Sequence, residues 1–273
     1  MAVLDVNVHR DRAAAAGSPD RCRALYLDLL KRTLLGLTYE DESNLYPEFP
    51  GAESRRVPHD SSRRIQGGDW PTLASTMIGI PRLDNIQSCI ENVLEDAVPG
   101  DLIETGVWRG GAVIFMRGVL KAYGVTDRTV WAADSFEGLP PPNAGKYPLD
   151  AGIHLEQYRE LAVSLEDVRH NFERYELLDE QVRFLEGWFR DSLPNAPIEK
   201  LAILRLDGDL YESTMDALAN LYDRVSRGGY VIIDDYGVIA ACKQAVHDFR
   251  AARGIHDPIV AIDVQGAFWR RSN

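Results

Sequence analysis

The sequence predicts an α/β protein with a doubly wound, mostly parallel sheet. Three observations lead to this prediction. Apolar strand patterns alternate with helical patterns through the second half of the chain, two strands end in clustered acids, and 273 residues with 45% hydrophobic side chains can bury one large core. Ligands of such sheets bind beyond the carboxyl ends of the strands. We therefore expect one catalytic core behind an N-terminal extension.

The N-terminal part differs in character from the core. Residues 1–20 are largely polar and alanine-rich, and we expect them to be poorly ordered. Helical spacing of apolar residues predicts helices over 21–37 and 82–97, whereas periodicity is lost over 38–71. A connection of that length is typically functional or disordered, so it is either a mobile lid or a plain linker. The predicted domains are residues 1–20, a helical extension and lid over 21–97, and the core over 98–273.

The core pattern alternates strands with helices. Strands are predicted over 101–105, 129–133, 182–185, 201–206 and 230–233, and helices over 112–123, 164–175, 213–225 and 240–252. The runs 259–264 and 267–270 are joined by Gln265-Gly266 and indicate a hairpin. Repeated βα units imply parallel strands, and the C-terminal hairpin implies an antiparallel edge.

Carboxylates follow two of these strands directly. Asp207 follows strand 201–206, and Asp234-Asp235 follows strand 230–233. Because neighbouring parallel strands end at one edge, the three side chains can converge on one cation, and oxygen-only ligands favour a hard ion such as Mg²⁺. Asp also ends strands and caps helices in many proteins. Asp209 is assigned to that second role, since Asp209-Leu210-Tyr211-Glu212 has the spacing of a capping box.

The loops after the first two core strands have features of a nucleoside site. The first runs Glu104-Thr105-Gly106-Val107-Trp108-Arg109-Gly110-Gly111 and allows close approach of a ligand, although it lacks the G-x-G-x-x-G signature. The second strand ends at Asp134, placed to accept hydrogen bonds from ribose hydroxyls. Glu104 can hold an ammonium group, so the pair suits S-adenosylmethionine. The alternative interpretation is that Glu104 and Asp134 are two unrelated acids at strand ends and do not form a ligand site.

The charge balance excludes a general nucleic-acid binder. Lys and Arg number 30 against 42 Asp and Glu, giving a formal net charge of -12 without a clustered basic face. Three cysteines without C-x-x-C spacing (Cys22, Cys89, Cys242) indicate a reducing compartment. Neither a signal-peptide core nor a run of roughly 18 apolar residues is present. We expect a soluble, cytoplasmic protein that binds neither nucleic acid nor membrane and takes a small, neutral or cationic substrate.

Five longer stretches carry a more specific signal: Glu104 to Gly111, Asp134 to Pro140, Glu186 to Phe189, Arg205 to Thr214, and Gly229 to Tyr236. Together they closely resemble the macrocin-type O-methyltransferases, a family that methylates deoxysugar hydroxyls of macrolide and aminocoumarin antibiotics. The resemblance extends from about Tyr26 to Arg270, with no match before Tyr26. It implies a class I methyltransferase fold, which is Rossmann-like, with S-adenosylmethionine as methyl donor and Mg²⁺ as metal.

The resemblance also implies roles for individual residues. The methionine part of the cofactor would contact Glu104, Thr105 and Gly106, and the ribose would contact Asp134. Ser135, Gly187 and Trp188 would line the adenine side, and Thr76 with Met77 would line the pocket as well; core packing is the alternative for Trp188. Asp207, Asp234 and Asp235 would ligate Mg²⁺, which agrees with their spacing.

The expected chemistry is metal-assisted attack of a sugar hydroxyl on the sulphonium methyl group. Such a hydroxyl loses its proton near the pKa of water, about 15.7, and a bound cation lowers that value by several units. Asp207 is assigned both as metal ligand and as general base. Coordination weakens a carboxylate as a base, so Asp207 either removes the proton or mainly orients the hydroxyl.

Two other functions remain open at this point. A catechol-type O-methyltransferase would use a similar metal geometry on vicinal phenolic hydroxyls. The second alternative function is that of a cofactor-binding subunit without catalysis, although a retained cluster of carboxylates argues against it. The expected partner is a glycosylated small molecule, contacted by the loops 38–70 and 137–158. The leucines of helix 21–37 must also be covered, either by the chain's own core or by a second copy in a homodimer or larger homo-oligomer.

Overall fold

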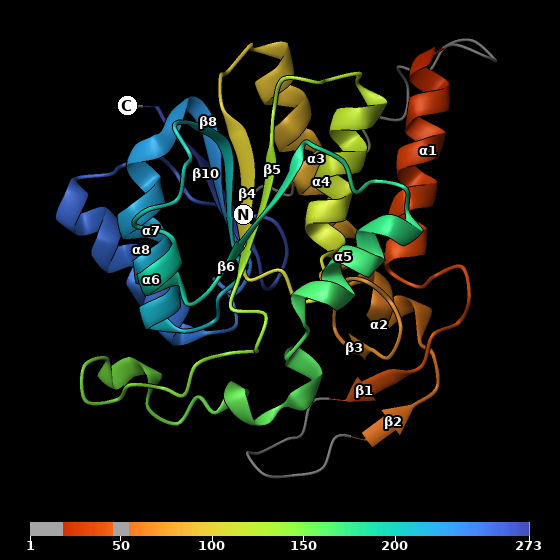
Figure 1. Cartoon of the computed structure of the whole chain (residues 1–273). Coiled ribbons are helices and arrows are strands. Elements are labelled where there is room, and N and C mark those ends of the chain that lie inside the picture. Colours follow the sequence, from red (N-terminus) through yellow and green to blue (C-terminus); the bar gives the residue numbers. More distant parts are fainter. Residues whose placement is uncertain (1–18, 46–54, 273) are drawn as a thin grey trace.

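A seven-stranded mixed sheet forms the centre of the protein in a computed structural model that describes residues 19–45 and 55–272 (Figure 1). The strand order is β6-β5-β4-β7-β8-β10-β9, and the first five strands in this order are parallel. β10 pairs antiparallel with both β8 and β9, so the predicted hairpin forms the antiparallel edge. The strands are β4 (Asp101–Thr105), β5 (Val130–Asp134), β6 (Val182–Glu186), β7 (Leu201–Leu206), β8 (Val225–Ile233), β9 (Val260–Ala261) and β10 (Ala267–Arg270).

Helices cover both faces of this sheet, as the doubly wound prediction requires. One face packs on α3 (Gly79–Glu95), α4 (Gly111–Ala122) and α5 (Leu165–Arg174), and α1 (Pro19–Leu34) packs against α4 in the same apolar cluster. The other packs on α6 (Phe189–Ser192), α7 (Tyr211–Leu221) and α8 (Ala240–Arg253). Alternation along the strands divides the core accordingly: Leu102 of β4 faces the first layer and Ile103 the second.

The extension contains a small second sheet that the sequence analysis did not predict. Its strands are β1 (Ser43–Leu45), β2 (Arg55–Val57) and β3 (Trp70–Pro71), in the order β2-β1-β3, with the short helix α2 (Ser61–Ile65) between β2 and β3. The described part of 38–71 is therefore folded onto the core. Residues 46–54 of the predicted lid, like most of residues 1–20, lie outside the described residues.

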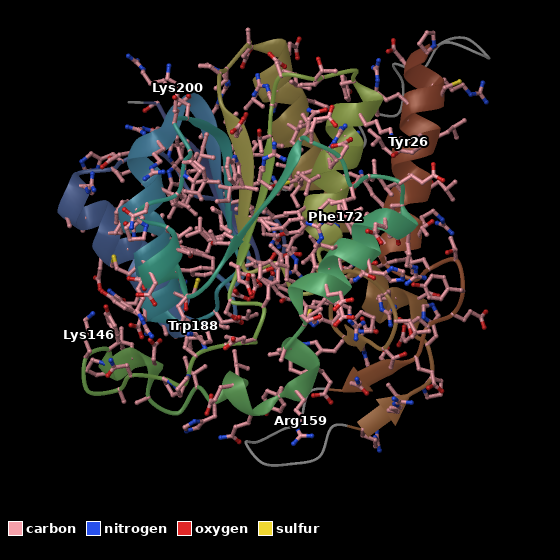
Figure 2. All side chains as sticks on the ribbon, viewed as in Figure 1. Tyr26, Lys146, Arg159, Phe172, Trp188 and Lys200 are labelled. Carbon is pink, nitrogen blue, oxygen red and sulfur yellow. The ribbon has the colours of Figure 1, made fainter. Side chains whose placement is uncertain are left out.

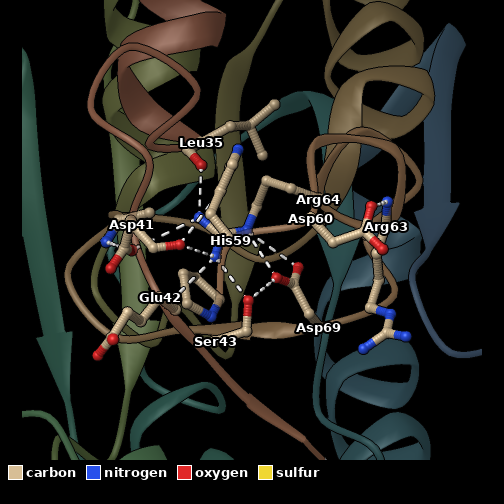
Figure 3. A network of polar contacts seen from close by, with 12 residues as sticks. Leu35, Asp41, Glu42, Ser43, His59, Asp60, Arg63, Arg64 and Asp69 are labelled. Atoms are coloured by element: carbon tan, nitrogen blue, oxygen red, sulfur yellow. Dashed lines mark hydrogen bonds and ion pairs between the residues drawn. The ribbon is translucent and has the colours of Figure 1, made fainter. Parts of the chain in front are cut away.

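A buried arginine holds this extension together (Figure 3). The Arg64 side chain is fully buried and donates to the Asp69 carboxylate, to the carbonyl oxygen of Leu35 and to the hydroxyl of Ser43. Asp41 pairs with Arg64 at 3.5 Å and accepts the backbone N–H groups of Leu73 and Ala74. This network fixes the chain that leads from β3 toward the core.

Three hydrogen bonds then attach that chain to the first βα turn of the core. Arg109 donates to the carbonyl oxygens of Pro71 and Ala74, at 3.1 and 3.0 Å. The backbone N–H of Gly111 donates to the carbonyl oxygen of Ser75 at 2.9 Å. A Cβ atom on Gly111 would lie 2.4 Å from that oxygen, so only glycine permits the approach. The segment after Ser75 is thereby placed beside the N-terminus of α4.

A long connection between β5 and α5 crosses the edge where the parallel strands end. It carries three 3-10 helices: η2 (Pro148–Asp150), η3 (Leu155–Gln157) and η4 (Arg159–Leu161). Near its end, the Trp108 indole N–H donates to the carbonyl oxygen of Glu160, and Tyr158 packs edge-on against Trp70, with ring centroids 5.4 Å apart. Among the described residues, no helix combines the length and apolar character that crossing a bilayer requires.

Candidate active site

A cavity of about 460 Å³ lies at the carboxyl edge of the parallel strands. Its walls come from the ends of β4, β5, β7 and β8, from the loop after β6, and from the extension on the opposite side. Figure 2 labels Trp188, which follows β6 and lines this cavity. Most of the residues that the sequence analysis assigned to the site line it: Thr76, Met77, Glu104, Gly106, Asp134, Ser135, Trp188, Asp207, Asp234 and Asp235.

Thr105 and Gly187 are not among the lining residues. Thr105 is fully buried, and its hydroxyl lies 3.5 Å from the carbonyl oxygen of Arg205 in the neighbouring strand. The backbone N–H of Gly187 donates to the carbonyl oxygen of Asp134 at 2.9 Å. Thr105 and Gly187 thus stabilise the strand ends, while the residues next to them, Glu104, Gly106 and Trp188, line the cavity.

Three carboxylates meet at the centre of the cavity. Asp207, Asp234 and Asp235 each offer one oxygen, and these oxygens lie within 4.8 Å of one another. The Asp235 side chain accepts no hydrogen bond from any described residue, and its Oδ2 is buried. Consecutive strand residues point to opposite faces, but the chain turns after β8, so Asp234 and Asp235 both reach the group. The donor set contains oxygen alone and fits a hard divalent cation.

Two buried arginines partly neutralise this cluster. Arg205 lies within β7 and is fully buried; it pairs with Glu104, with Asp234 and, at 2.8 Å, with Asp207. Arg82 of α3 pairs with the second oxygen of Asp234 and lies 3.3 Å from Asp263. Asp234 is therefore held on both oxygens by guanidinium groups, whereas Asp235 has no such partner.

The electrostatics show that the carboxylates are crowded. Burial raises the pKa of Asp207 to about 6, and the charge of Asp234 adds to the rise while Arg205 opposes it. Burial also raises the pKa of Glu104 and of Asp209 to about 8 each, with the charge of Asp207 contributing at both. Burial raises the pKa of Asp235 as well. A cation at the centre would favour the ionised forms of these groups.

The predicted cofactor acids lie beside this cluster, at the ends of β4 and β5. Glu104 uses Oε1 for Arg205, while Oε2 is buried without a hydrogen-bond partner. Asp134 accepts the backbone N–H groups of Val107 and Phe136, at 2.7 and 2.9 Å. These bonds fix the Asp134 carboxylate; the Ser135 hydroxyl also lies 3.4 Å from Oδ1, so Oδ2 is the oxygen better placed to accept from a ligand hydroxyl.

The assignment of Asp209 to helix capping is wrong. The Asp209 side chain caps nothing, and its φ of +59° is uncommon for a residue other than glycine. Asp150 of η2 provides the cap instead, since its carboxylate accepts the backbone N–H groups of Tyr211 and Glu212, at 2.7 and 3.1 Å. Asp209 is thereby left to line the cavity. The capping-box spacing is present in the sequence, but a fully buried carboxylate from a distant loop occupies the helix end.

Sequence reasoning missed the two arginines. A charge inside the apolar run 201–206 was the available signal for Arg205, because an arginine buried in a central strand needs partners. Arg82 gave no comparable signal, since a charge on an amphipathic helix is ordinary.

Comparison with known proteins agrees with this geometry. The family described as Macrocin-O-methyltransferase (TylF) matches residues 23–271. The 8-demethyl-8-(2,3-dimethoxy-alpha-L-rhamnosyl)-tetracenomycin-C 4'-O-methyltransferase of Streptomyces olivaceus is 56% identical over 92% of this chain and 94% of its own. The mycinamicin III 3''-O-methyltransferase of Micromonospora griseorubida is 54% identical over 93% of this chain and 99% of its own.

A solved structure also matches. The O-methyltransferase NovP is 52% identical, with a TM-score of 0.85 over 92% of this chain and 100% of that one. The calicheamicin methyltransferase CalS11, at 19% identity and a TM-score of 0.61, shares the fold. The class I methyltransferase fold expected from the sequence is therefore confirmed. The chain belongs to the macrocin-O-methyltransferase (TylF) family and is an S-adenosylmethionine-dependent O-methyltransferase.

Proposed function

We propose that this enzyme transfers a methyl group from S-adenosylmethionine to a deoxysugar hydroxyl of a glycosylated natural product, with the help of Mg²⁺. The observation that carries the proposal is the convergence of Asp207, Asp234 and Asp235 within one cavity. The glycosylated substrate is supported by the names of relatives, which act on a rhamnosyl tetracenomycin and on mycinamicin III. Such an enzyme would serve antibiotic biosynthesis.

The cofactor would bind at the ends of β4, β5 and β6. The unpartnered Oε2 of Glu104 would accept the cofactor's ammonium group, and Asp134 would accept the ribose hydroxyls. Trp188 and Ser135 would lie along the adenine, with Thr76 and Met77 opposite. These positions would hold the sulphonium methyl group toward Asp207.

Asp207, Asp234 and Asp235 fit a divalent cation, because their oxygens are close together and one buried oxygen of Asp235 lacks a donor. When bound, the cation makes a neighbouring hydroxyl more acidic. Asp207 would accept the hydroxyl proton, and positioning by its neighbours would align the oxygen with the methyl group. Arg205 already donates to Asp207 Oδ2, so Oδ1 is the oxygen left to face the substrate.

The acceptor would be enclosed by the extension and the loop between β5 and α5. Trp70 on one side and Leu139, Pro140 and Leu161 on the other line the cavity and would exclude water from the reacting groups.

Helix α1 leaves Leu25 and Leu29 exposed, at 62% and 58%, which is compatible with a homo-oligomer. Light scattering of the purified protein measures that state.

Mass spectrometry of a panel of acceptors tests the proposal. We expect a gain of about 14 Da on glycosides, including rhamnosides, and its loss in EDTA with recovery in Mg²⁺, because deprotonation is cation-assisted. Asp207→Asn should lower kcat by a factor of about 10² to 10⁴, the usual contribution of a general base. Turnover of catechols with no glycoside accepted would instead establish the catechol-type activity. Cofactor binding with no turnover on any acceptor would indicate a non-catalytic subunit.

A further inference from the structure

Acidic side chains outnumber basic ones in the cavity wall. Nine carboxylates and two arginines line it. Most of these carboxylates have a partner within the protein or belong to the proposed cation site. Asp69 pairs with Arg64, Glu104 and Asp234 pair with Arg205, and Asp134 is held by backbone N–H groups. Asp207 and Asp235 belong to the proposed cation site with Asp234, and the charge of Asp209 acts on Asp235 beside it. Glu212 and Asp216 of α7 remain.

Glu212 is buried in the cavity wall without a hydrogen bond to its carboxylate. Its exposed fraction is 6%, and no described residue donates to the carboxylate within hydrogen-bond distance. The nearest cation is Arg190 Nη1 at 3.9 Å, on a side chain that is 52% exposed. The carboxylate oxygens are not enclosed by the protein but open onto the cavity, where a ligand that donates hydrogen bonds can reach them.

A role in capping does not explain this side chain. In a capping box, Glu212 would accept the backbone N–H of Asp209, but the structure shows no such bond and gives the cap to Asp150. A glutamate in the first turn of a helix gains modestly from the helix dipole. That gain does not require the side chain to be buried against a cavity.

Asp216 extends the acidic wall by one helical turn. It also lines the cavity, and four residues of separation place it on the same face of α7 as Glu212. Burial raises the pKa of Asp216 to about 6, and the charge of Glu212 adds to the rise. The charges of Lys146 and Arg190 oppose that rise, so the protein itself balances only part of the negative charge at this end of the cavity.

We propose that Glu212, supported by Asp216, determines acceptor specificity by accepting hydrogen bonds from ring hydroxyls of the sugar beside the hydroxyl that is methylated. This inference rests on the proposed sugar substrate and adds a recognition subsite to it. Helix α7 follows β7, the strand that ends at Asp207, so a sugar presented to Asp207 lies next to the first turn of α7. Sugar hydroxyls are donors that a buried carboxylate binds through strong, charge-assisted hydrogen bonds.

Kinetics of Glu212→Gln on matched acceptors test this subsite. The probes are L-rhamnosides of one aromatic aglycone, together with analogues that each lack one ring hydroxyl. We expect Glu212→Gln to raise the acceptor KM by roughly 10- to 100-fold, the range for a lost hydrogen bond to a charged group, while kcat changes little. The wild type should discriminate strongly against one deoxy analogue, and the variant should not.

Two controls separate recognition from folding and from the proposed function. Glu199→Gln, at an exposed acid that does not line the cavity, should leave KM unchanged. Calorimetric binding of S-adenosylhomocysteine should be the same in Glu212→Gln as in the wild type, because the cofactor acids lie on β4 and β5. A wild-type enzyme that methylates rhamnosides, with equal KM in Glu212→Gln and unchanged discrimination, overturns the subsite alone. A wild type that methylates only catechols overturns the subsite and the sugar substrate together.

Discussion

Gly106 is the residue at which the cofactor loop and the strand of Asp207 meet. Its φ is +88°, and a Cβ atom there would lie 1.7 Å from the carbonyl oxygen of Asp207, which is backbone and cannot move aside cheaply. We expect Gly106→Ala to destabilise the fold by at least about 2–4 kcal/mol, through overpacking and the left-handed backbone together. Chemical denaturation measures the loss.

Gly124 supplies the matched control for that change. Its φ is +67°, but nothing lies within 4 Å of a Cβ placed there. Gly124→Ala should therefore cost only the backbone conformation, about 1 kcal/mol. Equal losses in the two variants would show that the approach of Gly106 to Asp207 is looser than described.

Asp216 makes stability depend on pH in a defined direction. Its pKa is raised by burial from an ordinary value of 3.8 to about 6, so the folded state binds the proton more tightly than the unfolded state. The stability gained by protonation is complete below about pH 4 and is lost as pH rises through 6. We expect Asp216→Asn to melt at a higher temperature than the wild type at pH 7.5, with the difference vanishing near pH 4. A constant difference across this range would contradict the assignment.

At the scale of elements, the small sheet of the extension depends on Arg64. Seven hydrogen bonds donated by one guanidinium group tie together the end of α1, the strand β1 and the start of β3, and Asp41 and Asp69 are buried beside it (Figure 3). We expect Arg64→Met to cost about 3–5 kcal/mol, because two buried carboxylates lose their counter-charge. Thermal and chemical unfolding measure the effect.

Arg63 is the neighbouring control. Its side chain points away from the Arg64 network, and its backbone N–H donates to the Asp60 carboxylate at 3.0 Å (Figure 3). Arg63→Met should change stability by no more than about 0.5 kcal/mol, as is usual away from buried networks. If Arg64→Met were equally mild, the extension would be held by its apolar contacts alone.

The elements differ in how well the sequence predicts them, and for physical reasons. Strands such as β4 and β7 are short segments buried on both faces, and their predicted bounds agree with the structure. The strands β1, β2 and β3 are only two or three residues long, which is too short for a periodic pattern to mark them. The cap on α7 was mispredicted because Asp150 lies 61 residues from Tyr211 along the chain, and local spacing carries no information about such a partner.

At the scale of the whole molecule, topology explains why the site was predictable in outline. The acids at the ends of β4, β5, β7 and β8 share one edge because these strands are adjacent and parallel, which the βα pattern implies. The guanidinium groups that hold those acids were not predictable. Arg205 and Arg82 reach Asp234 from β7 and α3, and only the packed structure shows that each oxygen of Asp234 accepts a hydrogen bond from a guanidinium group.

We propose that Asp207, Asp234 and Asp235 together bind one divalent cation. Titration with Mn²⁺, followed by electron paramagnetic resonance, tests it without any substrate, since Mn²⁺ shares the oxygen preference of Mg²⁺. The structure predicts one bound Mn²⁺ per chain, displaced by excess Mg²⁺ and lost in both Asp207→Asn and Asp235→Asn. Absence of binding at millimolar Mn²⁺, or binding that survives both substitutions, would contradict it.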